Sequence, residues 1–314
     1  MSGVLFQLFQ FALVAALAPL VTGLTPKVKA RLYGRIGPSP LQPYRDLARL
    51  LRKQPAAAEH ASTLFFASPA VAFVAIWLAA GLVPTFTTDL ALAPTADLIV
   101  LVALLAAARF ATALGGLDVG TAFGGIGASR DMMIAALAEP AMLMVIFTLS
   151  LVVGSTSLAF LVGFIANGGV GIEISMSLAL IALLMVAIAE NGRIPIDNPA
   201  THLELTMVHE AMVLEYSGRH LALVEGAQML KLTLYLSLLA AVFCPWGIAT
   251  AATPDGLMAG LILYLAKLAV GATGLGLFEV TIAKMRVFRA GEFLGGALLL
   301  GLLATIFRLI AETI

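Results

Sequence analysis

Residues Ala189 to His220 read AENGRIPIDNPATHLELTMVHEAMVLEYSGRH, and this stretch decides how the rest of the chain is interpreted. It holds seven charged residues and three histidines between two long apolar segments. Most of the remaining sequence is typical of membrane helices. A polar segment this dense between apolar segments indicates a place at the edge of a bilayer where the protein handles charge.

The composition indicates a membrane protein. The chain has 314 residues, of which 61% are hydrophobic and 11% are charged, whereas soluble domains carry roughly 25% charged residues. This leaves too little polar surface for a water-exposed globule of this size. We therefore predict an all-α, polytopic integral membrane protein. The net charge of zero gives no support for nucleic-acid binding.

Eight segments are apolar and long enough to cross a bilayer, which takes roughly 20 residues. We predict spans at 4–24, 64–84, 97–115, 131–153, 174–190, 223–247, 258–282 and 291–312. Segment 155–168 is apolar but short, so we expect it to lie on the surface or to re-enter rather than to span. The whole chain, residues 1–314, is predicted to be a single transmembrane domain.

The lysine and arginine positions predict the orientation of these spans. Fourteen of the 18 basic residues fall in the loops after the first, third, fifth and seventh predicted spans. Cytoplasmic loops are enriched in lysine and arginine. We therefore predict that these loops are cytoplasmic and that both termini lie on the non-cytoplasmic side.

Residues 40–53, PLQPYRDLARLLRK, form a separate basic segment. Leu47, Leu50 and Leu51 follow helical spacing, while the arginines face elsewhere. The pattern predicts a short amphipathic helix in the membrane interface, with its cations directed at lipid phosphates or at a partner. The alternative is a basic loop that only sets the topology.

The opening stretch carries its own helix signals. Prolines at 195 and 199 break any continuation of the span 174–190. Thr201 and Glu204 form a T-x-x-E capping box, so a helix is predicted from His202 to Tyr216, with Gly218 as its stop. Glu204 and Glu215 would share one face of that helix. Glu204 then acts either as the cap alone or as part of a functional acidic face.

The sequence predicts no metal site in this chain. His209-Glu210 resembles the start of a zinc-peptidase motif, but Val213 stands where the second histidine ligand is required. Cys244 is the single cysteine, so it cannot hold an iron–sulfur cluster by itself.

Several ionisable residues fall inside predicted spans. Glu139 lies about nine residues into its span, roughly 12–14 Å below the surface, so it should be protonated, paired or hydrated. Lys231 lies at a comparable depth from the same side, and Glu190 ends the span 174–190. Arg109 lies toward the inner end of its span, where snorkelling explains it.

The acidic residues of the cytoplasmic half are predicted to cluster. The predicted proton pathway consists of Glu139, Glu190, Glu204 and Glu215 with Lys231. Carboxylates whose pKa is raised by burial can exchange protons near neutral pH, which suits proton transfer. The alternative is a set of buried ion pairs that fix the packing of the helices.

The order of these motifs resembles a known family. The chain has a basic R-x-G-P loop at Arg35, a buried glutamate at 139, E-N-x-R-x-P-x-D from Glu190 to Asp197, and E-Y-S-G from Glu215 to Gly218. It resembles the core membrane subunit of respiratory complex I that supports the quinone cavity, together with its relatives in membrane-bound hydrogenases. The second long motif is similar to the formate hydrogenlyase and hydrogenase-4 branch.

The resemblance implies a non-redox anchor subunit of a membrane-bound nickel–iron hydrogenase in the cell inner membrane. It implies that loops 25–63 and 190–222 form a docking platform, with cavity and docking residues at Arg35, Arg193, Asp197, His202, His209 and Glu210. The implied partners are the hydrogenase large and small subunits, an iron–sulfur subunit and antiporter-like membrane subunits. The nickel–iron and iron–sulfur centres would lie in those partners, and this chain would bind no cofactor.

Two departures from the complex I pattern count against quinone binding. Ser39 replaces the usual asparagine, and THLELTMVHE replaces the usual acidic stretch. The alternatives to the hydrogenase anchor are a quinone-site subunit of an NADH:quinone oxidoreductase, a stand-alone ion antiporter, and a pure scaffold.

Overall fold

The computed structural model describes residues 2–56, 58, 60–168, 173–196, 207–250, 253–283 and 289–313. The regular structure within these ranges is helical, with two isolated β-bridges. The helices are α1 (Ser2–Leu32), α2 (Gln42–Arg52), α3 (Thr63–Leu82), the 3-10 helix η1 (Ala93–Thr95), α4 (Leu98–Asp118), α5 (Ala122–Val153), α6 (Leu158–Ala166), α7 (Ile174–Glu190), α8 (His209–Val213), α9 (Gly218–Phe243), α10 (Pro254–Thr281) and α11 (Ala290–Thr313).

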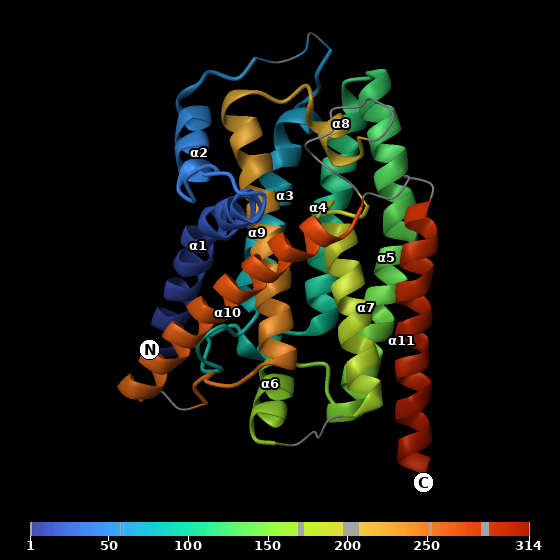
Figure 1. The fold of residues 1–314 in the computed structure, drawn as a ribbon. Helices are drawn as coiled ribbons and strands as arrows, with labels where there is room; N and C mark the ends of the chain where they lie inside the picture. Colours follow the sequence, from blue (N-terminus) through green and yellow to red (C-terminus); the bar gives the residue numbers. More distant parts are fainter. Residues whose placement is uncertain are drawn as a thin grey trace.

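The long helices form three groups that lie side by side (Figure 1). Helices α5, α7 and α11 pack together at one edge, and α3, α4 and α9 form the middle. Helices α1 and α10 pack against each other and against α9 on the other side, and α10 is strongly tilted (Figure 1). Alanine, leucine and valine dominate the main core between the groups.

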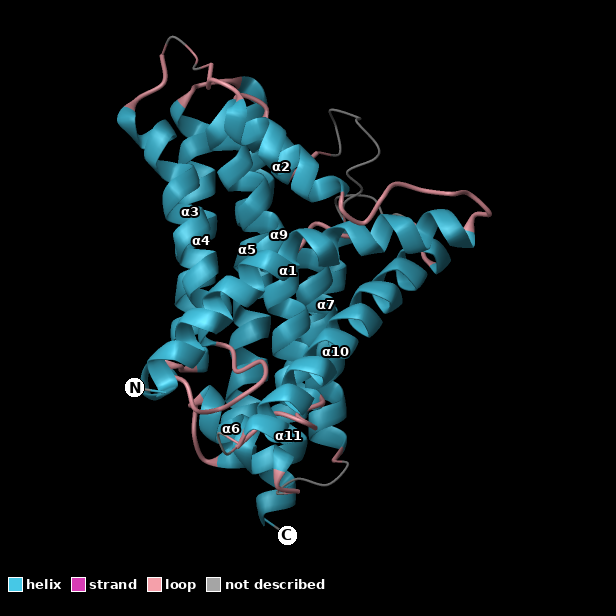
Figure 2. Ribbon diagram, turned by 90° about the vertical axis from the view of Figure 1, so that its left-hand side faces the viewer, coloured by secondary structure: helices cyan, strands magenta, loops and turns pink. Residues whose placement is uncertain are grey.

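The helices confirm an all-helical, multi-pass membrane protein. In the described part of the chain, seven helices are long and apolar enough to cross a bilayer: α1, α3, α4, α5, α9, α10 and α11. The eighth predicted span is α7, whose 17 residues rise about 26 Å, so the count of eight stays a prediction. Both termini lie toward the end of the bundle that carries α6 (Figures 1 and 2). The membrane face to which that end belongs also stays a prediction.

Some helices extend past the apolar segments that predicted them. Helix α1 continues to Leu32 rather than ending near 24, and α5 begins at Ala122 rather than near 131. These extensions carry basic or glycine residues, which lower the local hydropathy without interrupting the backbone hydrogen bonds of the helix. Glu139 consequently lies near the middle of α5 and not within its first turns.

The short helices occupy the ends of the bundle. The amphipathic segment 40–53 forms a helix, α2, and not a plain basic loop. Helix α6 has nine residues, which is too short to span, as predicted for 155–168. Helix α8 covers only 209–213 of the helix predicted over 202–216, and residues 197–206 lie outside the described part.

Gly218 was predicted to end the helix that starts near His202, and this was wrong. Gly218 has a φ of +53°, the left-handed conformation typical of a helix end. However, α8 ends earlier, at Val213, and Gly218 is the first residue of α9. Its backbone lies so close to Lys53 and Gln54 that a Cβ atom would contact their carbonyl groups at 2.8–2.9 Å.

Candidate functional site: a buried ion cluster

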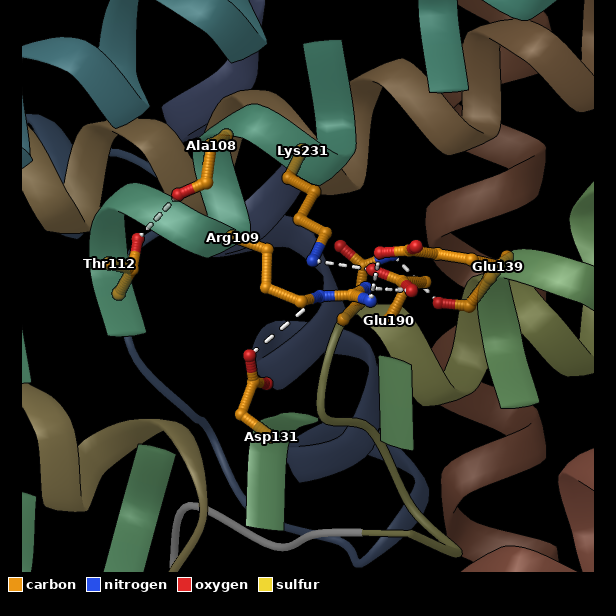
Figure 3. Close-up of polar contacts among 9 residues, drawn as sticks. Ala108, Arg109, Thr112, Asp131, Glu139, Glu190 and Lys231 are labelled. Carbon is orange, nitrogen blue, oxygen red and sulfur yellow. Dashed lines mark hydrogen bonds and ion pairs between the residues drawn. The ribbon is translucent and has the colours of Figure 1, made fainter. Parts of the chain in front are cut away.

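Arg109 lies at the centre of a buried cluster of ionisable side chains (Figure 3). Its Nη1 donates to Glu139 Oε1 at 3.1 Å, and its Nη2 donates to Glu190 Oε1. Its Nε lies 3.7 Å from Asp131 Oδ2. The Arg109 side chain is 6% exposed. One guanidinium therefore holds three carboxylates inside an apolar bundle.

Lys231 extends the cluster to a fourth long helix. Its Nζ lies 2.8 Å from Glu190 Oε2, so Glu190 is held by two cations (Figure 3). The Glu190 side chain is 4% exposed, whereas the Glu139 side chain is 39% exposed. The cluster thus runs from the protein interior to an outer surface.

A small cavity lies beside these side chains. Its volume open to water is about 10 Å³, close to the minimum needed for one water molecule. Apolar and polar groups line it together: Val102, Leu105, Ala106, Arg109, Ala138, Glu139, Met142, Glu190 and Tyr235. Its polar lining, with two carboxylates, a guanidinium and a phenol, suits a bound water.

The local sequence explains how these groups are positioned. Arg109 is on α4, whose alanines at 106–108 leave little bulk around the guanidinium. Glu190 is the last residue of α7, where the Asn191–Gly192 turn redirects the chain. Asp131 and Glu139 lie eight residues apart on α5, so roughly two turns separate them on one side of that helix.

Two parts of this cluster were not predicted from the sequence. Arg109 was explained as a snorkelling side chain, and this was wrong, because its guanidinium points inward to three acids. Asp131 was placed at the edge of a span and given no role. The sequence did offer a signal for Asp131, because it lies eight residues before Glu139 on the same helix. An arginine in a neighbouring span could therefore have been expected to pair with both acids.

The other predicted pathway residues have different positions. Glu215 is exposed in the turn after α8 and makes no contact with the cluster in the described part of the chain. Glu204 lies outside the described residues, as do the docking residues Asp197 and His202. The cluster thus brings together Glu139, Glu190 and Lys231 of the predicted set.

A second buried cluster lies at the other end of the turn after α7. Glu279 on α10 is 3% exposed at its side chain and accepts a hydrogen bond from Lys29 Nζ on α1 at 2.7 Å. Arg193 Nη1 lies 3.5 Å from the other oxygen of Glu279. Arg193, predicted at a cavity mouth, therefore ties the turn to the α1–α10 pair.

Helix α8 closes the bundle above the first cluster. It packs against α5 and α4, where Gly127 and Gly116 allow a close approach to Met212. His209 is partly exposed as a residue, but its Nε2 is buried and has no hydrogen-bond partner among the described residues. Burial, reinforced by the charge of Lys231, lowers the pKa of His209 to about 4. The imidazole is therefore neutral at pH 7.

The two loops predicted to form a docking platform contact each other. Ser217 Oγ accepts a hydrogen bond from the Ala56 N–H at 2.7 Å and donates one to the Ala56 carbonyl at 2.9 Å. Tyr216 stacks on Phe65 with ring centroids 4.2 Å apart. Arg35 is exposed between α1 and α2, and Glu210 is half-buried on α8.

Comparison with known proteins identifies similar chains. The profile of the NADH dehydrogenase family matches residues 5–310. Formate hydrogenlyase subunit 4 of Escherichia coli (strain K12) is 34% identical over 284 residues, 90% of this chain and 92% of that protein. Hydrogenase-4 component C of the same organism is 34% identical over 283 residues, 90% of this chain and 89% of that protein.

The fold is also similar to that of a solved structure. It matches a chain of the membrane-bound sulfane sulfur reductase, an archaeal respiratory membrane complex, with a TM-score of 0.83. The match covers 98% of this chain and 100% of that chain, at 19% sequence identity. At this identity the likeness concerns the fold alone.

Proposed function

The chain belongs to the NADH dehydrogenase family of membrane subunits, and on that premise we propose that it is the non-redox anchor subunit of a membrane-bound nickel–iron hydrogenase complex of the formate hydrogenlyase or hydrogenase-4 type. It docks the soluble electron-transfer arm and couples that chemistry to proton or sodium translocation across the cell inner membrane. The nickel–iron and iron–sulfur centres belong to the hydrogenase large and small subunits and an iron–sulfur subunit. This chain carries out no redox step.

The observation that carries the coupling role is the convergence of three carboxylates on Arg109. With Lys231 the cluster has two cations and three acids, so full ionisation leaves one negative charge in an apolar bundle. That charge is costly to bury. One carboxylate can therefore take up a proton and release it when a neighbouring cation moves. The small cavity supplies room for a water molecule that relays the proton.

The exposure of Glu139 supports a further membrane partner. Its side chain is 39% exposed near the middle of α5, and Leu143, one helical turn on, is 44% exposed on the same side. A carboxylate facing lipid at that position is expensive. An antiporter-like subunit packed against this face would cover Glu139 and continue the ion path.

The test is the coupling ratio of a Glu139→Gln variant in the complete complex. The amide keeps the shape and removes the exchangeable proton. We expect the number of ions moved per electron pair to fall at least about tenfold, because proton transfer through this position slows by roughly 10²–10⁴ while electron transfer in the partner subunits continues. Membrane vesicles with a pH-sensitive or sodium-sensitive dye report the ratio. Glu292→Gln, at an exposed ion pair on α11, is the matched control and should leave it unchanged.

Two results would contradict this function. An unchanged ratio in an assembled Glu139→Gln complex would indicate a scaffold without a role in coupling. A purified membrane complex that contains no hydrogenase-like or iron–sulfur subunit would refute the anchor role.

A further inference from the structure

Helix α2 presents a groove lined almost entirely by cations. Arg45, Arg49, Arg52 and Lys53, with Ala48 between them, border an open groove of about 500 Å³ on its outer side. All of these residues come from α2 and its C-terminal end, so the groove is open to the surroundings of the protein rather than enclosed by other helices.

No described acid forms an ion pair with Arg45, Arg52 or Lys53. Asp46, on the same helix, accepts hydrogen bonds from Arg49 at 3.0 Å and from Gln42 at 3.2 Å. The side chains of Arg45, Arg52 and Lys53 make no hydrogen bond or ion pair in the described part of the chain. Guanidinium groups in this arrangement match the geometry of a phosphate, which they can bind in bidentate fashion.

Contacts between α2 and α1 place the start of α2 at bilayer depth. The Tyr44 hydroxyl donates to the Ala16 carbonyl, in the middle of α1. Gly23 lies directly against the Pro40 carbonyl, where a Cβ atom would clash. Both α1 residues belong to the apolar stretch 4–24, which precedes the first lysine of the chain. The segment that opens α2 therefore lies beside a part of α1 that crosses the hydrocarbon.

From there α2 rises along α9 toward the end of the bundle that carries α8 (Figure 1). Leu47 packs on the core, whereas Leu41 and Leu51 are 51% and 56% exposed. The groove thus begins near hydrocarbon depth, has apolar side chains at its edges, and opens where the bilayer meets water. Acyl chains can contact the leucines while a phosphate contacts the arginines.

We propose that the α2 groove, lined by Arg45, Arg49, Arg52 and Lys53, binds the phosphate headgroup of an anionic phospholipid. The lipid covers the outer side of α2 and stabilises it against α1 and α9. This inference is independent of the hydrogenase assignment, because it concerns the bilayer alone.

The experiment measures lipid binding to the full-length chain in detergent by native mass spectrometry. Phosphatidylglycerol and phosphatidylcholine are titrated separately, and inorganic phosphate is added as a competitor. The variant Arg45→Gln/Arg52→Gln removes two cations that have no hydrogen-bond or ion-pair partner among the described residues, so its folding should be preserved. We expect it to lose roughly 30-fold in affinity for phosphatidylglycerol, from the usual contribution of a basic residue near an anionic membrane. Its weaker binding of phosphatidylcholine should not change.

The matched control is Arg31→Gln/Arg289→Gln, which removes two exposed cations outside the groove. Equal losses in both variants would reduce the effect to general electrostatics and overturn the site. Complete displacement of the lipid by inorganic phosphate would make it a site for a free phosphate ligand, which also overturns the proposal. So would loss of a partner subunit from the Arg45→Gln/Arg52→Gln complex with unchanged lipid content, since the groove would then be a protein interface.

Discussion

Two buried ion clusters lie at either end of the turn that follows α7, and they differ in their balance of charge. The first joins Arg109 and Lys231 to Asp131, Glu139 and Glu190. The second joins Glu279 to Lys29 and Arg193. Among the described residues, the first cluster has more acids than cations and lies beside a small cavity. Within the same described residues, the second has more cations than acids.

On the function proposed above, this difference separates a group that exchanges protons from a group that holds helices together. In that proposal, the carboxylate in excess gives the first cluster a proton to gain or lose. In the described part of the chain, Glu279 is the only acid paired with Lys29 and Arg193, so the second cluster has no carboxylate in excess there and ties α1, α10 and the turn together. Because Glu190 and Arg193 are three residues apart, a shift of the turn would disturb both clusters at once.

The largest expected effect comes from removing the cation that organises the first cluster. Arg109→Ala leaves three acids with Lys231 alone, and breaking a buried ion pair by removing one partner costs about 3–5 kcal/mol. We expect a loss of that size in the free energy of unfolding, measured by denaturant titration in detergent. Arg109→Lys should recover part of it, because the charge remains while the bidentate geometry is lost.

A loss below about 1 kcal/mol for Arg109→Ala would show that the acids are already neutral without the guanidinium. The first cluster would then resemble the second in having no spare charge, and the comparison between them would fail.

His209 tests how far the influence of the first cluster reaches. The pKa of its imidazole is lowered to about 4 by burial and by the charge of Lys231, whereas an unfolded histidine titrates near about 6.5. Between these values the unfolded chain binds more protons. The stability from the neutral imidazole is therefore fully present above about pH 6.5 and is lost as the pH falls toward 4.

We expect a decrease on the order of 2 kcal/mol over that pH range, and His209→Gln should flatten it. Melting temperatures at a series of pH values measure the change. His60→Gln, at an exposed histidine, serves as the control and should leave the slope as it is. If His209→Gln also left the pH dependence of the melting temperature unchanged, Lys231 would not affect the protonation of the imidazole. The electrostatic influence of the first cluster would then not reach α8.

Sequence reasoning predicted the spans better than it predicted the cluster. Hydropathy found the seven helices long enough to cross a bilayer and the shorter apolar helix α7, because burial in lipid requires an uninterrupted apolar stretch. It also found Glu139, Glu190 and Lys231, since an ionisable residue within such a stretch is conspicuous. It misplaced the start of α5, because Arg130 and Asp131 lower the local hydropathy although the helix continues through them.

The direction of a side chain was the information that the sequence lacked. Arg109 near a span end is compatible with snorkelling or with an inward ion pair, and the choice depends on which helices are neighbours. Only the packing of α4 against α5 brings its guanidinium to Asp131 and Glu139. The amphipathic helix α2 could be predicted, because its pattern is local, but its contact with Ala16 depends on the fold.

The smallest expected effect belongs to the second cluster and completes the comparison. Glu279→Gln removes the described acid that pairs with Lys29 and Arg193, but their side chains are 28% and 19% exposed, so both can turn toward water. We expect a loss of about 1–2 kcal/mol in the free energy of unfolding, less than for a fully enclosed pair. The ion-to-electron ratio should stay at the wild-type value, because no proton is exchanged there. A drop in that ratio comparable to the one expected for Glu139→Gln would place Glu279 on the ion path, and charge balance would no longer distinguish the two clusters.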